Sequence, residues 1–420
     1  MISDSSSLPS SADVVIVGAG LAGLTAARVL EQSGINAIVL EASDGVGGRV
    51  RSDNVDGFIL DRGFQVLLTA YPEIHRHLNI PALDLKIFEP GAVVWREGKG
   101  TVVSDPFRRP KTLASTTFAP IGTVGDKARI ALMRAKLKSA DPRALLRGQD
   151  IPTASALRGM GFSSKMIDRF FRSLVGGIQL DPSLSSSRRM FDIIFRTLAT
   201  GDSAVPAKGM GQITEQLAAS LRTTSVYLNT AVASITAGVV TLANGNTITA
   251  KNIVVATEGP VASQLLGLPE VASKSAGCVY FAASKSPIDG GYIVLDGHGQ
   301  GPVYNVAVMS NISPHYAPSG QHLIAAALPG LADGDLEAAA RRQLRSWWGA
   351  DVDTWRHLRT YRIPHGQPGQ DPPFNPKKSV SLGNGLFVCG DHRDTGSIQG
   401  AMFSGRRCAE AVIEAVRLSA

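Results

Sequence analysis

The chain has 420 residues, of which 44% are hydrophobic and 18% charged, with a formal net charge of +7. This length accommodates two domains with a core each, the composition is that of a soluble globular protein, and no apolar run reaches the roughly 18 residues of a membrane span. Three scattered cysteines exclude a disulfide framework and a zinc site and indicate a reduced, cytoplasmic setting; residues 1–13 lack the features of a secretory signal and predict a short disordered leader.

Residues 13–51 carry the strongest pattern in the chain. The run rich in Val and Ile at 13–17 predicts a buried parallel strand, and a glycine-rich turn then leads into a helix. A second strand follows at 35–40 and ends at Glu41. The whole is a complete βαβ dinucleotide-binding fingerprint, in which an acidic residue at this position accepts the ribose hydroxyls.

The three glycines of this turn have separate physical tasks. Gly18 makes the tight turn, Gly20 lets the backbone approach a pyrophosphate, and Gly23 lets the helix pack close to the strand. The start of the helix offers unpaired N–H groups and a positive dipole end to the phosphates.

A second glycine-rich turn, 44–49 (DGVGGR), follows Glu41. It resembles the extension found after the ribose-binding acid in the flavin-dependent amine oxidase and phytoene desaturase superfamily. This resemblance implies that backbone N–H groups and Arg49 complete a cradle around the pyrophosphate of FAD. We therefore expect FAD rather than NAD, bound without a covalent link because Cys389 lies inside a predicted strand.

The next segment predicts the start of a second domain. Residues 58–60 predict a strand, and 61–65 (DRGFQ) resembles the superfamily's aspartate–glycine step, which brings the chain near the flavin ring. Residues 74–83 predict a helix, in which His75 and His77 lack the third ligand of a metal site. Short strands are then predicted at 86–88, 92–96 and 101–103.

Residues 106–150 are basic, with ten Lys and Arg against three acids. No interleaved aromatic residues or nucleic-acid motif accompany them, so we do not expect a nucleic-acid partner. A partly amphipathic helix in this stretch could rest on an anionic membrane surface, but we favour a solvated helix in a cap over the substrate. Helices continue through 155–175 and 185–199 and would complete this cap.

From 205 to 265 the chain is expected to return to the first domain. A helix is predicted at 212–222, a hairpin at Asn244-Gly245, and a buried strand at 251–257. By resemblance, Val232 lends backbone hydrogen bonds to the adenine.

The following part predicts the sheet of the second domain. Strands are expected at 276–283, 291–295, 303–309 and 323–328, a helix at 335–348, and a loop-rich segment over 355–365. Three aromatic residues on these strands are interpreted as core rather than substrate contacts: Tyr280, Phe281 and Tyr304.

The C-terminal segment carries the second strong signal. The strand at 385–389 ends in Gly390-Asp391, and a short turn leads through Gly396 into a helix that ends near 417. This resembles the superfamily's closing flavin motif. There the aspartate holds ribityl or phosphate oxygens, and the helix N-terminus stabilises the anionic reduced flavin.

The expected fold class is α/β, with a Rossmann-type FAD-binding domain built from discontinuous segments (1–85, 205–265 and 378–420). An α+β substrate-binding domain with a mixed sheet and a helical cap occupies 86–204 and 266–377. The expected cofactor-binding residues are Gly18, Gly20, Leu21, Ala22, Gly23, Glu41, Ala42, Gly47, Gly48, Arg49, Gly63, Phe64, Val232, Gly390, Asp391, Ser397, Ile398, Gln399 and Ala401. His392 and Gln65 are the candidate catalytic residues beside the flavin, and no metal site is expected.

The sequence contains no serine-hydrolase, zinc-protease or Walker motif, so the flavin carries the chemistry. We expect hydride transfer from a substrate C–H bond to flavin N5, and reoxidation by oxygen or a quinone. Amine oxidases of the superfamily usually have a lysine near N5 and an aromatic residue shortly before the last helix, where this chain has 392–394 (HRD). This departure favours the phytoene desaturase side and a lipophilic substrate, with an amine oxidase, or a flavin-binding sensor or assembly factor without turnover, as alternatives.

Overall fold

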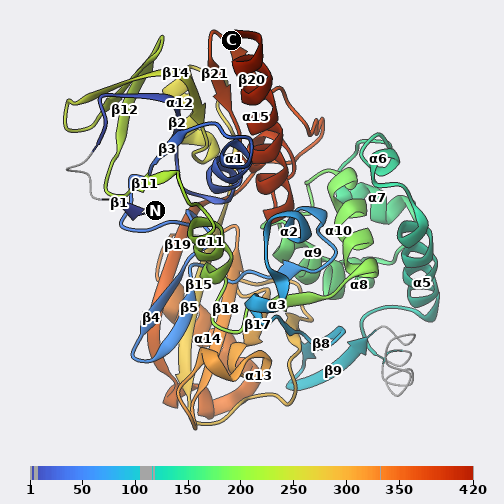
Figure 1. Ribbon diagram of the computed structural model, residues 1–420. Helices are drawn as coiled ribbons and strands as arrows, with labels where there is room; N and C mark the ends of the chain where they lie inside the picture. Colours follow the sequence, from blue (N-terminus) through green and yellow to red (C-terminus); the bar gives the residue numbers. More distant parts are fainter. Residues whose placement is uncertain (1, 4–7, 105–115, 117–118, 332, 420) are drawn as a thin grey trace.

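A computed structural model describes residues 2–3, 8–104, 116, 119–331 and 333–419 (Figure 1). Part of the predicted basic stretch, 106–115, and part of the predicted leader, 4–7, lie outside these described residues. Two large sheets and a group of helices beside them make up the fold (Figure 1). None of the helices in the described ranges combines the length and the apolarity needed to cross a membrane.

Within the described residues, the first sheet has nine strands in the order β1-β11-β3-β2-β14-β13-β12, with β21 paired to β14 and β20 paired to β21. Its centre is parallel: β2 pairs with β3 on one side and with β14 on the other. The strands are β1 (Ile2–Ser3), β2 (Ser11–Val17), β3 (Ala37–Leu40), β11 (Ser225–Tyr227), β12 (Val232–Thr236), β13 (Val239–Leu242), β14 (Thr247–Val255), β20 (Ser381–Gly383) and β21 (Leu386–Val388).

The central strands β2 and β14 are apolar because helices cover the sheet, which leaves Val14, Ile16 and Val254 without exposed surface. The predicted hairpin at Asn244-Gly245 is confirmed, since β13 and β14 pair antiparallel around it. The first and last helices, α1 (Leu21–Gln32) and α15 (Ile398–Ser419), cross closely beside this sheet (Figure 1). A Cβ added at Gly405 would lie 2.2 Å from the carbonyl oxygen of Ala22, so only glycine permits this approach.

The second sheet has seven strands among the described residues, in the order β19-β15-β18-β17-β16-β8-β9, and is mixed. Only β16 and β8 pair in parallel; the other pairs are antiparallel. The strands are β8 (Gly91–Arg96), β9 (Lys99–Ser104), β15 (Ser273–Ala283), β16 (Ile293–Asp296), β17 (Asn305–Val308), β18 (His322–Pro329) and β19 (Arg356–Pro368).

Two smaller sheets are separate from the large ones. One pairs β4 (Ser52–Val55) with β5 (Phe58–Asp61), and the other places β10 (Ser203–Val205) between β6 (Leu67–Leu68) and β7 (Lys86–Ile87). The α/β fold class is confirmed. The division into domains at 85, 204, 265 and 377 stays a prediction.

The helices beside the sheets are mostly short. Several stand together as a separate group, with α5 and α6 at its outer side (Figure 1). In addition to α1 and α15 they are α2 (Pro72–His77), α3 (Ile80–Leu83), α5 (Val124–Ser139), α6 (Pro142–Leu145), α7 (Thr153–Gly159), α8 (Ser164–Met166), α9 (Arg172–Ile178), α10 (Arg188–Thr200), α11 (Gly211–Ala219), α12 (Gly259–Leu266), α13 (Met309–Ile312) and α14 (Leu336–Trp348).

Three local predictions were wrong. Residues 1–13, predicted as a disordered leader, include the paired strand β1 (Ile2–Ser3) and the first residues of β2, which begins at Ser11. The helix predicted over 74–83 is divided into α2 and α3, because Leu78 and Asn79 are extended and Pro81 belongs to the first turn of a new helix. The segment 355–365, predicted as loop-rich, lies largely in the strand β19. A register shift opposite residues 274–276 of β15 accommodates Pro364, which has no N–H to donate.

Candidate functional site

In the turn between β2 and α1, the surroundings of each glycine agree with its predicted task. Gly18 has a φ of +105°, which favours glycine, and a Cβ at Gly23 would lie 1.9 Å from the carbonyl oxygen of Gly18. A Cβ at Gly20 would meet no protein atom within 4 Å, although Gly20 lies on a cavity wall. Gly23 is therefore a packing glycine, whereas Gly20 keeps open the space where a ligand can approach the start of α1.

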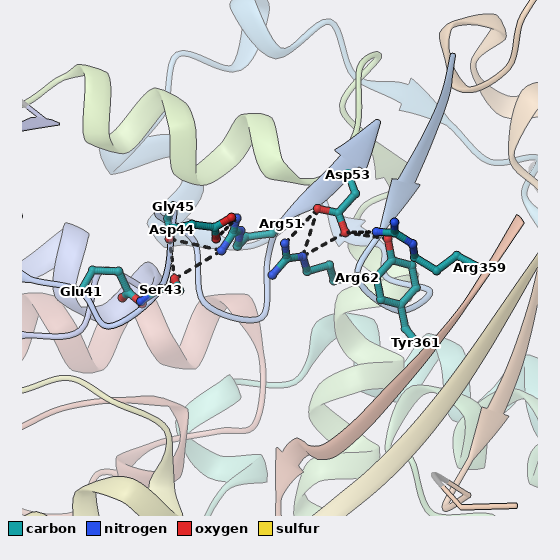
Figure 2. A network of polar contacts seen from close by, with 9 residues as sticks. All are labelled: Glu41, Ser43, Asp44, Gly45, Arg51, Asp53, Arg62, Arg359 and Tyr361. Atoms are coloured by element: carbon teal, nitrogen blue, oxygen red, sulfur yellow. Dashed lines mark hydrogen bonds and ion pairs between the residues drawn. The ribbon is translucent and has the colours of Figure 1, made fainter. Parts of the chain in front are cut away.

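Glu41 joins the end of β3 to this turn through Ala19 and to the following residues through Ser43, which Figure 2 shows beside it. Its carboxylate accepts hydrogen bonds from the backbone N–H of Ala19 at 2.7 Å, from the N–H of Ser43 at 2.9 Å and from Oγ of Ser43 at 2.7 Å. A carboxylate has about four acceptor positions, so capacity for a ribose hydroxyl remains. The acid is fixed in place before any ligand arrives.

The second glycine-rich turn packs against the first. The N–H of Gly47 donates to the carbonyl oxygen of Ala19 at 2.8 Å. Arg51 closes the turn from outside, donating to Asp44 at 2.9 Å and to Oγ of Ser43 at 3.3 Å (Figure 2). These bonds hold the two glycine turns together at the cavity wall.

Arg49 joins this turn to the C-terminal motif. Its Nη2 atom donates to Oδ1 of Asp391 at 2.7 Å, and its Nη1 atom donates to the carbonyl oxygen of Gly366 at 2.8 Å. All three residues line the same cavity. The pair of motifs that the sequence places at opposite ends of the chain is thus brought together by a direct ion pair.

The start of α15 is fixed by its own side chains and by contacts with two other segments. The N–H of Gly396 donates to Oε1 of Gln370 at 2.8 Å, and Oγ of Ser397 accepts from the N–H of Gly400 at 3.0 Å. Oε1 of Gln399 accepts from the N–H of Glu73 on α2 at 3.0 Å. The helix N-terminus, whose dipole end is positive, is therefore held rigidly against the cavity.

A buried carboxylate positions the predicted flavin-adjacent step, 61–65. Asp61 accepts from Oγ of Ser52 at 2.6 Å, from the N–H of Met210 at 2.8 Å and from the hydroxyl of Tyr316 at 2.8 Å. Burial raises the pKa of Asp61 to about 6 despite these three donors. The network fixes the strand end from which Gly63 and Phe64 reach the cavity wall.

The two candidate catalytic residues differ in position. Gln65 lines the cavity, but its Nε2 atom donates to the carbonyl oxygens of Arg49 at 2.7 Å and Arg62 at 3.2 Å, so it braces the turn. His392 is buried and is not part of the cavity wall, and neither ring nitrogen has a partner within the described part of the chain. Burial lowers the pKa of His392 to about 4, which keeps the ring neutral at pH 7.

One cavity of about 1280 Å³ connects these elements. Small-molecule pockets usually measure about 300–1,000 Å³, so there is room for a dinucleotide and part of a second molecule. Apart from Gly23 and His392, every predicted site residue lines it: Gly18, Gly20, Leu21, Ala22, Glu41, Ala42, Gly47, Gly48, Arg49, Gly63, Phe64, Gln65, Val232, Gly390, Asp391, Ser397, Ile398, Gln399 and Ala401. The roles assigned to these residues stay predictions.

Most of the rest of the wall was not predicted. It comes from several elements, among them α5, α9, α10, β8, β9 and β15 to β19. It includes Phe88, Phe170, Leu174, Phe195, Leu295, Asn305, Ile363 and Gln367. The interpretation of Tyr280 and Phe281 as core is confirmed, since both are buried and neither faces the cavity. Alternating apolar residues in a strand do not reveal which ones face a cavity.

The residues present fit FAD. The open space at Gly20 admits a pyrophosphate, the acid at the end of β3 suits a ribose, and the cavity continues past the start of α15. One cationic group, Arg49, and one acidic group, Asp391, lie where the two motifs meet. Among the residues that the structure describes, no three His, Cys, Asp or Glu side chains are grouped so that they could hold a metal ion.

Comparison with known proteins gives the same result. The family model described as flavin containing amine oxidoreductase matches residues 21–413. Putrescine oxidase of Kocuria rosea is 28% identical over 239 residues, which cover 53% of this chain and 49% of that protein. Protoporphyrinogen oxidase 2 of Arabidopsis thaliana is 44% identical over 61 residues, 14% of this chain and 12% of that protein.

The matched segments thus span about half or less of the length of these relatives. Among solved structures, putrescine oxidase bound to putrescine superposes with a TM-score of 0.70 at 17% identity, covering 96% of this chain and 99% of that one. This likeness shows a shared fold. The chain belongs to the flavin containing amine oxidoreductase family, whose members are FAD-dependent oxidoreductases, and its cofactor is FAD.

Proposed function

We propose that the chain is an FAD-dependent oxidoreductase that removes a hydride from a C–H bond of a lipophilic, isoprenoid-like or carotenoid-like substrate. When bound, FAD supplies the hydride acceptor, the N5 atom of its ring system. The observation that supports this proposal most directly is the apolar wall of the cavity beyond the nucleotide cradle.

In this proposal the chain has two tasks. The segments 18–22, 47–49 and 390–391, together with Glu41, hold the cofactor through backbone N–H groups and fixed charges. The apolar side chains of the cavity wall outside the nucleotide cradle bind the substrate by burying its apolar surface. They also keep water away from the reacting atoms.

The positions of the lysines argue against an amine-oxidase site. Among the described lysines, only Lys127 and Lys377 line the cavity. Lys127 donates to the carbonyl oxygen of Ala119, and Lys377 lies over the ring of Phe403. Lys285, the lysine nearest to a predicted cavity strand, is exposed and does not line the cavity.

Amine oxidation with release of hydrogen peroxide is the alternative, and the comparisons favour it. Putrescine oxidase is a relative in sequence and in fold. Glu89 and Asp202 also line the cavity, and a carboxylate can attract an ammonium group. A flavin-binding sensor or assembly protein without turnover is the further alternative.

Anaerobic bleaching of the protein-bound flavin separates the three functions. The purified holoprotein is mixed with panels of amines, carotenoids and porphyrinogens, and its visible absorption is followed. Bleaching by the lipophilic compounds supports the proposal. Bleaching by amines, with peroxide release in air, supports the alternative, and bleaching by neither class supports a protein without turnover.

The electron acceptor in this proposal is oxygen or a quinone. A quinone and a lipophilic substrate both reside in membranes, so we also propose peripheral membrane contact through α5. This helix contributes Val124, Ile130 and Arg134 to the cavity wall, and Val124 and Leu132 are 69% and 71% exposed. Exposed apolar residues beside several cations are the features of a helix that rests on an anionic surface.

A further inference from the structure

One buried polar side chain in the largely apolar part of the cavity wall has an unpaired oxygen atom. Asn305, the first residue of β17, lines the cavity and is 6% exposed. Its direct neighbours across the sheet are Leu295 on β16 and Ala327 on β18, and both line the cavity as well. Since directly paired residues share one face of a sheet, the amide is flanked by apolar groups on both sides.

In the part of the chain that the structure describes, the Oδ1 atom of Asn305 is fully buried and has no hydrogen-bond partner. Buried polar groups in folded proteins are nearly always paired, because an unpaired one loses its hydrogen bonds to water without replacement. An apolar residue at this position would remove that cost. The contacts within the folded chain therefore do not explain why a polar side chain stands at this position.

A neighbouring glycine makes room for this amide. A Cβ at Gly177, on helix α9, would lie 2.1 Å from Nδ2 of Asn305. The backbone of Gly177 is helical and its φ is not positive, so its conformation does not require glycine. Glycine within a helix is unfavourable relative to alanine, and here it leaves the space that the asparagine occupies.

We propose that Asn305 recognises a hydroxyl group on an otherwise lipophilic substrate. A hydroxyl can donate to an amide oxygen or accept from an amide N–H, so it pairs with whichever end of the Asn305 amide is turned toward the cavity. The surrounding wall, with Leu174 and Leu295, takes up the hydrocarbon part. This inference rests on the proposed lipophilic substrate and makes it more specific: a long-chain or isoprenoid alcohol rather than a pure hydrocarbon.

Binding to the holoprotein tests this without turnover. Geranylgeraniol, its methyl ether and the corresponding hydrocarbon are titrated in detergent, and the shift in the visible absorption of bound FAD gives each dissociation constant. We expect the alcohol to bind about tenfold more tightly than the hydrocarbon, with the ether between them, because a matched polar pair replaces an unpaired amide.

Three variants assign the effect to the amide. Asn305→Leu keeps the side-chain size and is expected to bind the alcohol and the hydrocarbon within about twofold of each other. Gly177→Ala pushes a Cβ against Nδ2 and should reduce the preference as well. Leu174→Ala, on the same helix, is the matched control: it removes apolar surface and should weaken all three probes without changing their order.

FAD content and the thermal unfolding temperature show that each variant is folded. Equal affinity of the wild type for alcohol and hydrocarbon, or an unchanged preference in Asn305→Leu, would overturn the role of Asn305 and leave the lipophilic substrate standing. Failure of the wild type to bind any of the three probes would overturn both.

Discussion

Arg49 and Asp391, 342 positions apart in the sequence, form an ion pair in which Nη2 of Arg49 donates to Oδ1 of Asp391 at 2.7 Å. The first belongs to the glycine turn after β3, and the second belongs to the turn before α15. Both side chains face the cavity that we assign to FAD. The pair therefore holds the N-terminal and C-terminal motifs together at the wall of the cofactor site.

Replacing Arg49 by methionine is expected to weaken both folding and FAD binding. The Asp391 side chain is 7% exposed and would lose its cation, which costs about 2–3 kcal/mol for a pair whose arginine is one-third exposed. Urea unfolding and FAD titration measure the two effects. The control is Lys251→Ala, which breaks an exposed pair with Asp13 and should change stability by less than about 1 kcal/mol. Equal, small effects in both variants would show that the Arg49–Asp391 pair is not needed.

Two alanine substitutions in the same turn should have different effects, one on FAD binding and the other on folding. Gly20→Ala adds a Cβ that meets no protein atom, so the protein should fold normally but bind FAD at least about tenfold more weakly. Gly23→Ala places a Cβ 1.9 Å from the carbonyl oxygen of Gly18 and should destabilise the fold itself. Circular dichroism and flavin fluorescence separate the outcomes. A Gly20→Ala protein with unchanged FAD affinity would refute the assignment of that space to the pyrophosphate.

The ion pair between Glu73 and Arg406 should make stability depend on pH. Burial alone would raise the pKa of Glu73, but the bonds from His77 and Arg406 outweigh it and lower the pKa to about 2. Because the folded pKa is below the unfolded one, the contribution is complete above about pH 4.5 and is lost as the pH falls toward 2. The advantage of the wild type over Glu73→Gln in urea unfolding should therefore shrink between pH 6 and pH 3.

The matched control for this pair is Glu410→Gln, which removes the exposed carboxylate that the same arginine also contacts. Its effect should stay below about 1 kcal/mol. A Glu73→Gln variant with the same small effect at every pH would contradict the prediction.

His392 tests whether a buried imidazole contributes to chemistry or only to packing. Its pKa is lowered to about 4 by burial, so the folded state takes up a proton less readily than the unfolded state. Stability should decline as the pH falls from about 6.5 to about 4, and His392→Leu should abolish that part of the decline. Flavin reduction by a reacting substrate should continue in this variant. A hundredfold slower reduction with full FAD content would instead support the catalytic role considered for His392.

Contact with a membrane can be tested on α5. Leu132→Glu should abolish sedimentation of the holoprotein with vesicles that contain anionic phosphatidylglycerol, because it places a charge on the exposed apolar face beside the cations. Leu418→Glu alters another exposed leucine, near the end of α15, and should leave sedimentation unchanged. If the wild type does not sediment with these vesicles, α5 is the solvated cap helix that the sequence favours.

The local predictions succeeded where a short segment carries its own physical reason. The glycine spacing at 18–23 and the hairpin at Asn244-Gly245 require particular backbone angles, so they can be recognised without knowing what packs around them. The strand β19 shows the opposite case. Its sequence does not alternate between apolar and polar residues, because most of its side chains are partly or fully exposed at the edge of the sheet. Its prolines are residues that are typical of loops.

The sequence alone determined the βαβ dinucleotide-binding fold, because its turn depends on backbone geometry within about 30 residues. The resemblance of the second glycine turn and of the C-terminal motif to a known superfamily indicated FAD, and the roles of the individual cofactor-binding residues stay predictions. Only the tertiary structure decided that Arg49 meets Asp391, that His392 lies behind the cavity wall, and that Asn305 stands unpaired among apolar side chains. Those relationships join segments that are far apart along the chain. Their energies come from burial and contact, which no local pattern of residues contains.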